Sequence, residues 1–383
     1  MDVSFWRSGV AEDHREGIPA LGNTRAREYQ GEGIPARGNT SAREYQRVID
    51  ESRSPTYKKR GNSTVTFIRY LRQGALMAPL VWKTVAESQG NCATIRKSGK
   101  TIGVVPTMGA LHAGHLSLAV GSQAACDVTV VTIFVNPTQF GPDEDLSRYP
   151  RTFEEDMDKL AAMGVDAVFA PGVEEMYPAG ATTSIDPPTI AQPLEGVCRP
   201  GHFRGVATIV LKLFLAVPAD RAFFGQKDFQ QSLVIQHMVK ELNHPIAIDV
   251  LPIVREPDGL AMSSRNRHLS PAERERALAL RRTLRNAKKW IEEGEQSYED
   301  ISRRMQEELE EHVDKIDYAL VADATSLAPL VPNPTSTAGL SAAGPSAAGL
   351  SAENGNSSSA VALIAAYVGA TRLIDNEIID LGN

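Results

Sequence analysis

The feature that most constrains the fold is an alternation of apolar, strand-like runs with helical stretches between residues 101 and 254. The predicted strands are 101–106, 127–135, 166–170, 221–225 and 246–254, and the predicted helices are roughly 115–125, 154–163, 205–216 and 229–242. Strands that are apolar along their whole length and alternate with helices are typical of a parallel sheet covered on both faces. The sequence therefore predicts an α/β fold.

The pattern changes after residue 265. The stretch "SPAE" (270–273) is a helix start, with Ser at the N-cap, Pro at the first position and Glu three residues after the cap. The helix should present one apolar face and end at Gly294, and a second amphipathic helix should carry Ile301, Met305, Leu309 and Val313. Strand-like runs at 316–322 and 360–368 complete a small α+β domain.

Two segments lack the pattern of a folded core. "EGIPALGNTRAREYQ" recurs almost unchanged sixteen residues later, within the first 76 residues, and neither copy has an apolar periodicity. We expect residues 1–76 to be disordered and Met77 to be a second candidate for the start of the protein. Residues 331–359 repeat Ala, Gly and Ser, a composition that buries too little apolar area to offset its ordering entropy, so we expect a flexible insertion.

Composition narrows the partners. The formal net charge is −7, which gives a nucleic-acid partner no general electrostatic support. The three cysteines are far apart in the sequence, which fits a reducing compartment better than a disulfide framework. The most apolar long run, 205–217, is too short to span a bilayer and contains Lys212. We therefore expect a soluble, cytoplasmic protein without a nucleic-acid or membrane partner.

The stretch "TMGALHAGH" places His112 and His115 at the opening of a helix that follows a strand. Residues three apart share one helix face, and a helix start offers unpaired N–H groups and partial positive charge, so the pair suits a phosphate. Zinc would need further ligands, and no Cys or His cluster supplies them. Two histidines that merely pack in a turn are the third interpretation. The spacing alone leaves all three open.

Three further loops follow predicted strands. "FFGQKDFQQ" places Lys227, Asp228 and Gln231 at a helix start; "IFVNPTQF" contains Gln139; and "GLAMSSRNRHLS" gathers hydroxyl and guanidinium groups that could clamp a phosphate. Each loop alone could equally be a solvated cap or a linker. "SGKT" (98–101) is not a P-loop, because the glycine that this motif requires is replaced by Thr94 and the run precedes its strand.

Taken in order, these motifs resemble those of the pantothenate synthetase (pantoate–β-alanine ligase) family. The resemblance rests on "PTMGALHxGH", "IFVNPTQF", "YPRT", "RPGHFRGVAT", "FFGQKD" followed by "QQ", and "DGLAMSSRN", and covers 101–330 and 360 to the end. It implies a Rossmann-like domain over 77–257, a smaller C-terminal lid over 258–383 that carries the insertion 331–359, and a homodimer. The implied reaction joins pantoate to β-alanine through pantoyl adenylate, releasing pyrophosphate and AMP.

The resemblance also implies a role for individual residues. His115, His112 and Lys227 would be catalytic, with His115 in the position of a proton donor. Gln139 and Gln231 would bind pantoate, Gln139 also bordering β-alanine. ATP would contact Met108, Gly109, Ala110, Leu111, His112, Ala113, Gly114, His115, Gly225, Gln226, Lys227, Asp228, Val254, Met262, Ser263, Ser264 and Arg265.

No metal ligand is assigned to the protein, because Mg²⁺ should arrive on the ATP phosphates. Glu155 and Asp156 match acidic positions sometimes assigned to the metal, but we interpret them as carboxylates on a helix surface. The nearest rival function is another nucleotidyl transferase of the same architecture. A scaffold that has lost catalysis is the non-enzymatic alternative.

Overall fold

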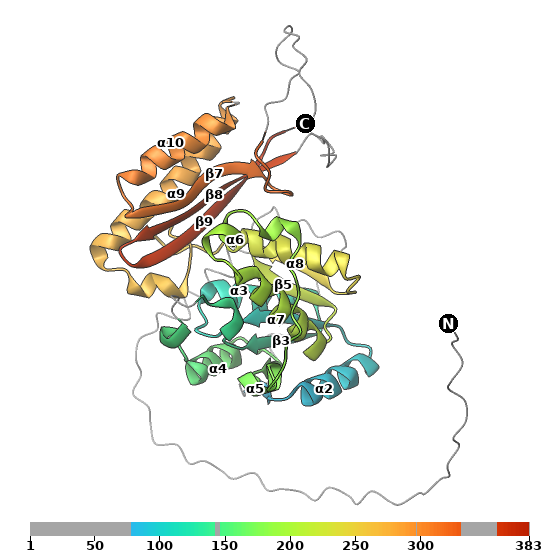
Figure 1. Cartoon of the computed structure of the whole chain (residues 1–383). Coiled ribbons are helices and arrows are strands. Elements are labelled where there is room, and N and C mark those ends of the chain that lie inside the picture. Colours follow the sequence, from blue (N-terminus) through green and yellow to red (C-terminus); the bar gives the residue numbers. More distant parts are fainter. Residues whose placement is uncertain (1–77, 142–145, 296, 331–357, 383) are drawn as a thin grey trace, which may run out of the picture.

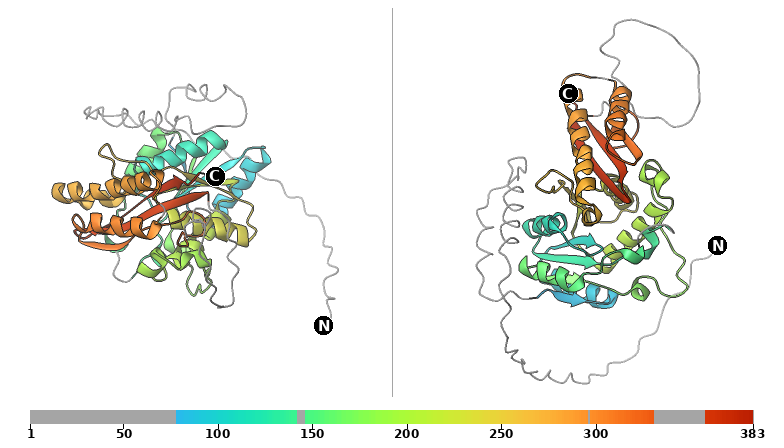
Figure 2. Two further views of the ribbon diagram at one scale, coloured as in Figure 1. Left: turned by 90° about the horizontal axis from the view of Figure 1, so that it is seen from above. Right: turned by 90° about the vertical axis from the view of Figure 1, so that its left-hand side faces the viewer.

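The computed structural model describes residues 78–141, 146–295, 297–330 and 358–382. The expectations for residues 1–76, for Met77 and for nearly all of the Ala/Gly/Ser insertion lie outside these ranges. Figure 1 shows two units: a larger one, which contains β3, β5 and α7, and a smaller one, which contains β7, β8, β9, α9 and α10. The right-hand view in Figure 2 places the smaller unit at one end of the larger one.

The larger unit is built on a six-stranded sheet in which every pairing is parallel. Its strands are β1 (Leu80–Trp82), β2 (Ile102–Thr107), β3 (Val128–Ile133), β4 (Ala167–Phe169), β5 (Arg221–Gly225) and β6 (Ala247–Leu251). Their order is β1-β4-β3-β2-β5-β6. The chain moves outward from β2 to β3 and β4 on one side, then returns to β5 and β6 on the other. Open sheets of this kind bind ligands at the carboxyl ends of the strands flanking that reversal, here β2 and β5.

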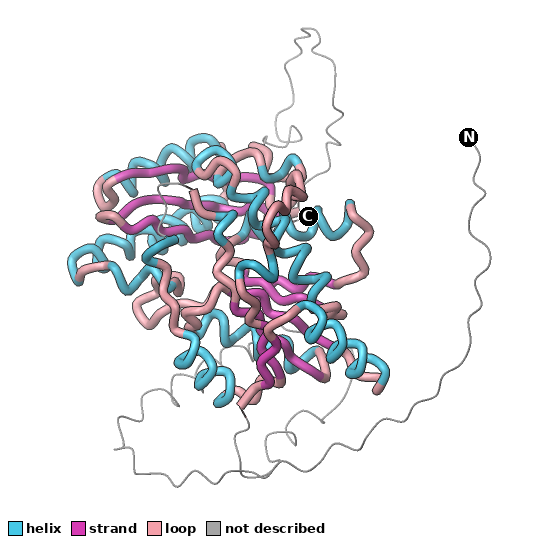
Figure 3. Tube along the Cα trace, turned by 60° about the horizontal axis from the view of Figure 1, so that its bottom comes forward, coloured by secondary structure: helices cyan, strands magenta, loops and turns pink. Residues whose placement is uncertain are grey.

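The helices of the larger unit surround this sheet, as the tube in Figure 3 shows. They are α2 (Val85–Lys97), α3 (Ala113–Ala125), α4 (Phe153–Ala162), α5 (Val173–Met176), α6 (Glu195–Cys198), α7 (His202–Ala216) and α8 (Phe229–Glu241). The predicted strands and helices are therefore confirmed, with shifts at their ends. The sequence analysis missed β1 and α2, which precede the first predicted strand.

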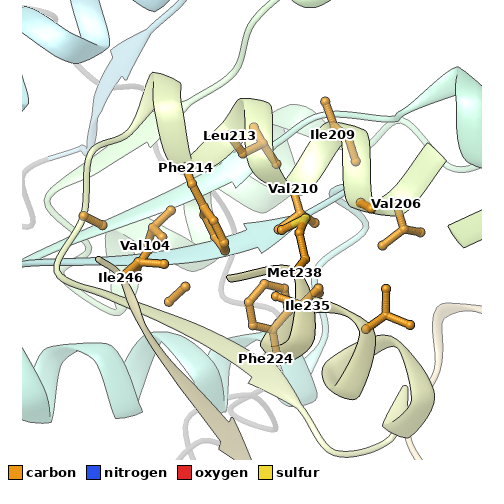
Figure 4. Close-up of a cluster of buried hydrophobic side chains, with 14 of the residues drawn as sticks. Val104, Val206, Ile209, Val210, Leu213, Phe214, Phe224, Ile235, Met238 and Ile246 are labelled. Carbon is orange, nitrogen blue, oxygen red and sulfur yellow. The ribbon is translucent and has the colours of Figure 1, made fainter. Parts of the chain in front are cut away.

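Neighbouring strand residues point to opposite faces of the sheet, and both faces are buried. In β2, Val104 belongs to the core shared with α7 and α8, whereas Val105 belongs to the core shared with α3 and α4. Figure 4 shows the first core, where Val104 and Phe224 of the sheet meet side chains of α7 and α8. The buried residues on both faces confirm the predicted two-faced packing. Each fully buried side chain of this size contributes roughly 1.5–3 kcal/mol to the stability of the fold, and this packing holds the strand ends in place.

The smaller unit contains an antiparallel sheet and two helices. The strands β7 (Lys315–Asp323), β8 (Ser359–Val368) and β9 (Thr371–Asp380) pair in that order. The helices α9 (Pro271–Glu292) and α10 (Tyr298–Glu310) pack their apolar residues against it. The predicted capping box is present, since Ser270 Oγ accepts from the Glu273 N–H and the Glu273 carboxylate accepts from the Ser270 N–H. Gly294, with φ +97°, follows α9 as predicted.

Three details of the smaller unit differ from the sequence analysis. Val313 was placed in the second helix, but α10 ends at Glu310 and Val313 packs beyond it, partly buried against the same core. Strand β8 begins at Ser359, the last residue of the predicted insertion, and strand β9 was not predicted. None of the described helices is long and apolar enough to cross a lipid bilayer.

Candidate active site

A cleft opens at the carboxyl edge of the parallel sheet. Its cavity of about 240 Å³ is lined by the ends of β2 and β5, the start of α3, α7 and the loop before α9. A second cavity of about 590 Å³ lies between the larger unit and β9. The two cavities share lining residues, among them Arg199, Lys227 and Arg265, so they form one continuous cleft between the units.

Most of the predicted site residues line this cleft. Those in its wall are Met108, His112, Gly114, His115, Gln139, Gly225, Lys227, Asp228, Gln231, Val254, Met262, Ser263, Ser264 and Arg265. The other predicted ATP contacts, Gly109, Ala110, Leu111, Ala113 and Gln226, are not among the lining residues of either cavity. Ala110 and Leu111 are buried behind the wall, and the Gln226 side chain donates to Asn376 Oδ1 at 3.1 Å.

The paired histidines stand at the start of α3, His112 at the N-cap and His115 in the first turn. Their ring centroids are 4.0 Å apart. The backbone N–H of His112 donates to His115 Nδ1 at 3.4 Å, so a neutral His115 ring carries its hydrogen on Nε2 and can donate from there. His112 Nδ1 is buried, faces Gly114 and has no hydrogen-bond partner among the described residues.

Both imidazoles are neutral at physiological pH. Burial, assisted by the nearby charges of His115 and Lys227, lowers the pKa of His112 to about 2. Burial also lowers the pKa of His115 to about 4, although the Asp228 carboxylate acts in the opposite direction. The histidines therefore offer N–H groups rather than positive charge, and cationic side chains must neutralise any bound anion.

That charge comes from the turn between β5 and α8. Lys227 and Asp228 line the cleft there, with Lys227 Nζ 3.7 Å from Asp228 Oδ1 and the lysine side chain 21% exposed. Lys227 is close enough to His112 to lower the pKa of its ring. The imidazole pair and the lysine–aspartate turn thus face the same cavity, as the arrangement of strand ends predicts.

The loop before α9 docks directly onto the histidine helix. Met262 Sδ accepts the Gly114 N–H at 3.3 Å, and the Met262 N–H donates to the Val254 carbonyl. Ser263 then caps the short helix Ser264–His268 by accepting from the Arg265 N–H. These contacts place both serines and Arg265 in the lining of the same cavity as the histidine pair.

Gln139 is held from both sides. The Asn136 side chain donates to Gln139 Oε1 at 3.0 Å, and Gln139 Nε2 donates to Met108 Sδ. His202 Nδ1 lies 2.9 Å from the Gln139 carbonyl oxygen, and Arg199 Nη1 lies 3.1 Å from His202 Nε2. Because arginine only donates, His202 Nε2 accepts and its Nδ1–H donates to Gln139.

The sequence analysis did not assign Asn136, Tyr149, Arg199 or His202, all of which line the cleft. The last two stand in "RPGHFRGVAT", which was recognised as a motif without a role for its side chains. Only their position beside Gln139 indicates a role for these side chains. The sequence does not show that position, because His202 and Gln139 are 63 residues apart in the chain.

The interpretation of the acidic pair is right for one residue and wrong for the other. Glu155 is exposed on α4, as expected, but Asp156 is fully buried beneath the histidine turn. Among the described residues, no group of three or more His, Cys, Asp or Glu side chains is arranged to hold a metal ion. Asp156 is a structural neighbour of the cleft rather than a surface carboxylate.

Strand β9 of the smaller unit closes the opposite side of the cleft. Asn376 Nδ2 donates to the carbonyls of Gln226 and Lys227, both at 3.0 Å. Arg255 donates to both carboxylate oxygens of Asp375, at 2.7 and 3.0 Å. The lysine turn is therefore positioned by residues of both units.

Helix starts, neutral imidazoles and a lysine gathered at the reversal point of a parallel sheet define a nucleotide-binding α/β enzyme. Comparison with known proteins gives the family. The model of the family "Pantoate-beta-alanine ligase" matches residues 80–378, and the chain belongs to that family of carbon–nitrogen ligases. The family match decides against the rival nucleotidyl transferase.

Individual relatives agree. The chain is 46% identical over 302 residues to a pantothenate synthetase of Moorella thermoacetica, covering 79% of this chain and 99% of the relative. It is 48% identical over 295 residues to pantothenate synthetase 1 of Bradyrhizobium diazoefficiens, covering 77% and 96%. The crystal structure of the Thermus thermophilus pantothenate synthetase matches with a TM-score of 0.68 and 39% identity, covering 79% of this chain and 100% of that one.

A further solved relative is described with ligands. The pantoate–β-alanine ligase of Francisella tularensis, described as complexed with "Beta-gamma ATP and Beta-alanine", matches with a TM-score of 0.58 and 31% identity. The match covers 79% of this chain and 98% of that one.

Proposed function

We propose that this cleft joins pantoate to β-alanine in two steps. In the first, a pantoate carboxylate oxygen attacks the α-phosphorus of ATP, and the bond to pyrophosphate breaks. In the second, the β-alanine nitrogen attacks the acyl carbon of pantoyl adenylate, AMP leaves with the electron pair of the C–O bond, and the nitrogen loses a proton. Family membership and the ATP- and β-alanine-complexed relative support this reaction for the chain.

The first step needs alignment and charge neutralisation rather than a base. A carboxylate with an ordinary pKa near 4 is already ionised at neutral pH. What the step requires is a nucleophile in line with the α-phosphate and donors for the charge that builds up on the phosphates. The cleft wall supplies donors from His112, His115, Lys227 and the loop that carries Arg265.

The residue roles follow from this geometry. Lys227 and Arg265 would neutralise phosphate charge, while His112 and His115 would donate to phosphate oxygens from neutral rings. Ser263 and Ser264 would add hydroxyl donors from the loop that docks on the start of α3. Gln139 and Gln231 would bind pantoate through neutral amides, and Gln139 would also border β-alanine. The single observation that carries this assignment is that the histidine pair and Lys227 face one cavity.

We propose that Mg²⁺ reaches the site bound to ATP. The described residues contain no acidic cluster for a metal, and Asp228, at the cleft, is paired with Lys227 at 3.7 Å. A hard cation of this kind prefers phosphate oxygens and water to a dedicated protein cage. The metal would offset charge on the triphosphate, while the chain's own residues bind and orient it.

We further propose a cytoplasmic homodimer. Cys92, Cys126 and Cys198 are all free thiols, which fits a reducing compartment. The dimer is implied by the family resemblance, and sedimentation of the purified chain at several concentrations tests it.

The decisive test of the reaction is ATP–pyrophosphate exchange measured with and without pantoate. Exchange that requires pantoate and proceeds without β-alanine is the expected result, because the adenylate forms before the amine enters. Exchange driven by an amino acid, or no exchange by a folded protein that binds no ATP, would overturn the proposal.

A further inference from the structure

The buried carboxylate of Asp156 lies directly beneath the turn that carries the histidine pair. Asp156 is in the first turn of α4 and is fully buried, whereas Asp158 on the same helix is exposed. A buried carboxylate is stable only when its oxygens are hydrogen-bonded or paired. The partners of Asp156 therefore show what the residue does.

Those partners are backbone groups of the predicted ATP-binding turn. The Ala110 N–H donates to Asp156 Oδ2 and the Leu111 N–H donates to Oδ1, both at 2.8 Å. The Thr152 hydroxyl donates to Oδ2 at 3.1 Å. Hydrogen bonds to an ionised acceptor are stronger than neutral ones, so the carboxylate holds the backbone of two consecutive residues of the turn in place.

Lys159 binds a backbone carbonyl of the same turn. Its ammonium donates to the Leu111 carbonyl at 2.9 Å and lies 3.8 Å from Asp156 Oδ1. Asp156 and Lys159 are one helical turn apart on α4, so a single rigid element holds both the N–H and the C=O of Leu111. Both carboxylate oxygens have donors, and an ammonium lies beside them, which makes Asp156 a poor ligand for a metal ion.

The turn needs such support because its backbone is unfavourable. Ala110 has φ +51°, a left-handed conformation that is uncommon for residues with a side chain, and Gly109 has φ +82°. A Cβ on Gly109 would lie 3.2 Å from Asp156 Oδ2, so the backbone passes close to the carboxylate. Three residues after Gly109 the chain reaches His112, the N-cap of α3.

We propose that Asp156 is a positioning residue for ATP: it fixes the 108–112 turn so that the histidine pair and the start of α3 face the phosphates. Asp156 does not line the cleft and does not touch the substrate; it acts through the turn. The inference rests on the proposed function, since it requires that this turn holds ATP. According to this proposal, α4 contributes to the affinity for ATP although the helix lies outside the cleft.

The test compares Asp156→Asn with the matched control Asp158→Asn, which changes the same chemical group on the exposed side of α4. Wild-type exchange that depends on pantoate first establishes the reaction independently of the inference. Asp156→Asn should then raise the KM for ATP by about tenfold, because the amide nitrogen cannot accept one of the two backbone N–H groups and the remaining bond loses its charge. The KM for pantoate should rise much less, because Gln139 touches this turn only through Met108 Sδ and its Oε1 is held separately by Asn136.

The separation of the two KM values distinguishes positioning from a merely structural role. A variant that only lowers the fraction of folded protein would reduce kcat and leave both KM values at the wild-type level. If Asp156→Asn does not fold, Lys159→Met tests the same turn by removing its bond to the Leu111 carbonyl, and it should raise the KM for ATP by a few-fold. Unchanged ATP KM in the folded variant tested, or an equal rise for pantoate, would overturn the proposal.

Discussion

The two walls of the cleft are held by different kinds of contact. The turn wall, residues 108–115, belongs to the larger unit alone and is fixed by backbone bonds to buried Asp156 and by the docking of Met262. The strand wall, residues 372–376 of β9, belongs to the smaller unit and meets the larger one through side chains. The turn wall is anchored mainly by backbone hydrogen bonds, and the strand wall is anchored by side-chain contacts between the units.

The attachment of the strand wall combines apolar and ionic contacts. Tyr318 and Leu320 of β7 pack against the core of the larger unit. Glu195, at the start of α6, accepts from the Tyr318 hydroxyl at 2.7 Å and from Arg372 at 2.7 and 2.9 Å. Burial by itself would raise the pKa of Glu195, but the hydrogen bonds from Arg372 outweigh it and keep that pKa below its usual value.

This difference indicates that the two walls have different roles, one in substrate binding and the other in holding the two units together. Preorganised donors stabilise a reaction because they need not reorganise during it, and the turn wall has that character. The strand wall is joined to the larger unit by hydrogen bonds and also by apolar residues of β7 and β8 that are buried in the core of that unit, so separating the units would expose part of that core. Variants in the turn wall should therefore affect chemistry. Variants in the strand wall should mainly affect the association of the units, except at Asn376, whose side chain also holds the Gln226 and Lys227 carbonyls.

The largest effect is expected for the side chains that we propose bind the phosphates. His115→Ala should slow adenylate formation by about 10²–10³-fold, the usual loss for one preorganised donor, and Lys227→Ala should do at least as much. Pyrophosphate exchange at saturating ATP and pantoate measures both. Turnover like that of the wild type in His115→Ala would show that the turn wall is not the phosphate site, and in Lys227→Ala it would show that the turn between β5 and α8 is not.

The next effect concerns the strand wall. Glu195→Ala leaves Tyr318 without its buried acceptor and leaves Arg372 with Asp317 as its one buried carboxylate, and it should lower the free energy of unfolding by about 3 kcal/mol, as measured by urea denaturation. Glu174→Ala, an exposed change on α5, is the matched control. The KM for ATP should remain unchanged in both variants. A large rise in that KM for Glu195→Ala alone would remove the distinction between the walls.

The pH dependence of stability sharpens the comparison further. The folded pKa values of His112 and His115, about 2 and 4, lie below the unfolded value near 6.5. Below pH 6.5 the unfolded chain binds protons that the folded chain does not, so unfolding becomes easier by up to about 1.4 kcal/mol per pH unit for each histidine. The loss of stability caused by His115 should stop growing near pH 4, where the folded protein also binds the proton. Denaturation of His115→Gln between pH 4 and 7 should show a shallower slope; an unchanged slope would contradict the pKa assignment.

The smallest effect tests the packing behind the imidazoles. A Cβ at Gly114 would lie 3.0 Å from two atoms of the His112 ring, so Gly114→Ala should displace that ring and slow exchange by about tenfold. Gly90→Ala on α2, where nothing lies within 4 Å of the added Cβ, is the control. Equal rates for the two variants would mean that the position of His112 is not critical.

Much of this architecture could be predicted from local sequence. The strands between 101 and 254 are continuous apolar runs, and "SPAE" specifies the start of α9 within a few residues. By contrast, β1 and α2 were missed because the strand is short and α2 buries mainly Ser88 and Cys92, which leaves little apolar periodicity to detect. Val313 was wrongly assigned to the helix because it continues the spacing of the apolar residues, and that spacing does not show where α10 ends.

The sequence by itself determined which groups stand at strand ends and helix starts, because those positions depend on neighbours a few residues away. Only the tertiary structure decided that Asp156 is buried rather than exposed. Its partners Ala110 and Leu111 are 46 and 45 residues distant, and burial depends on which surface packs over a helix. Long-range packing likewise brought Arg199 and His202 beside Gln139, a proximity that no local spacing encodes.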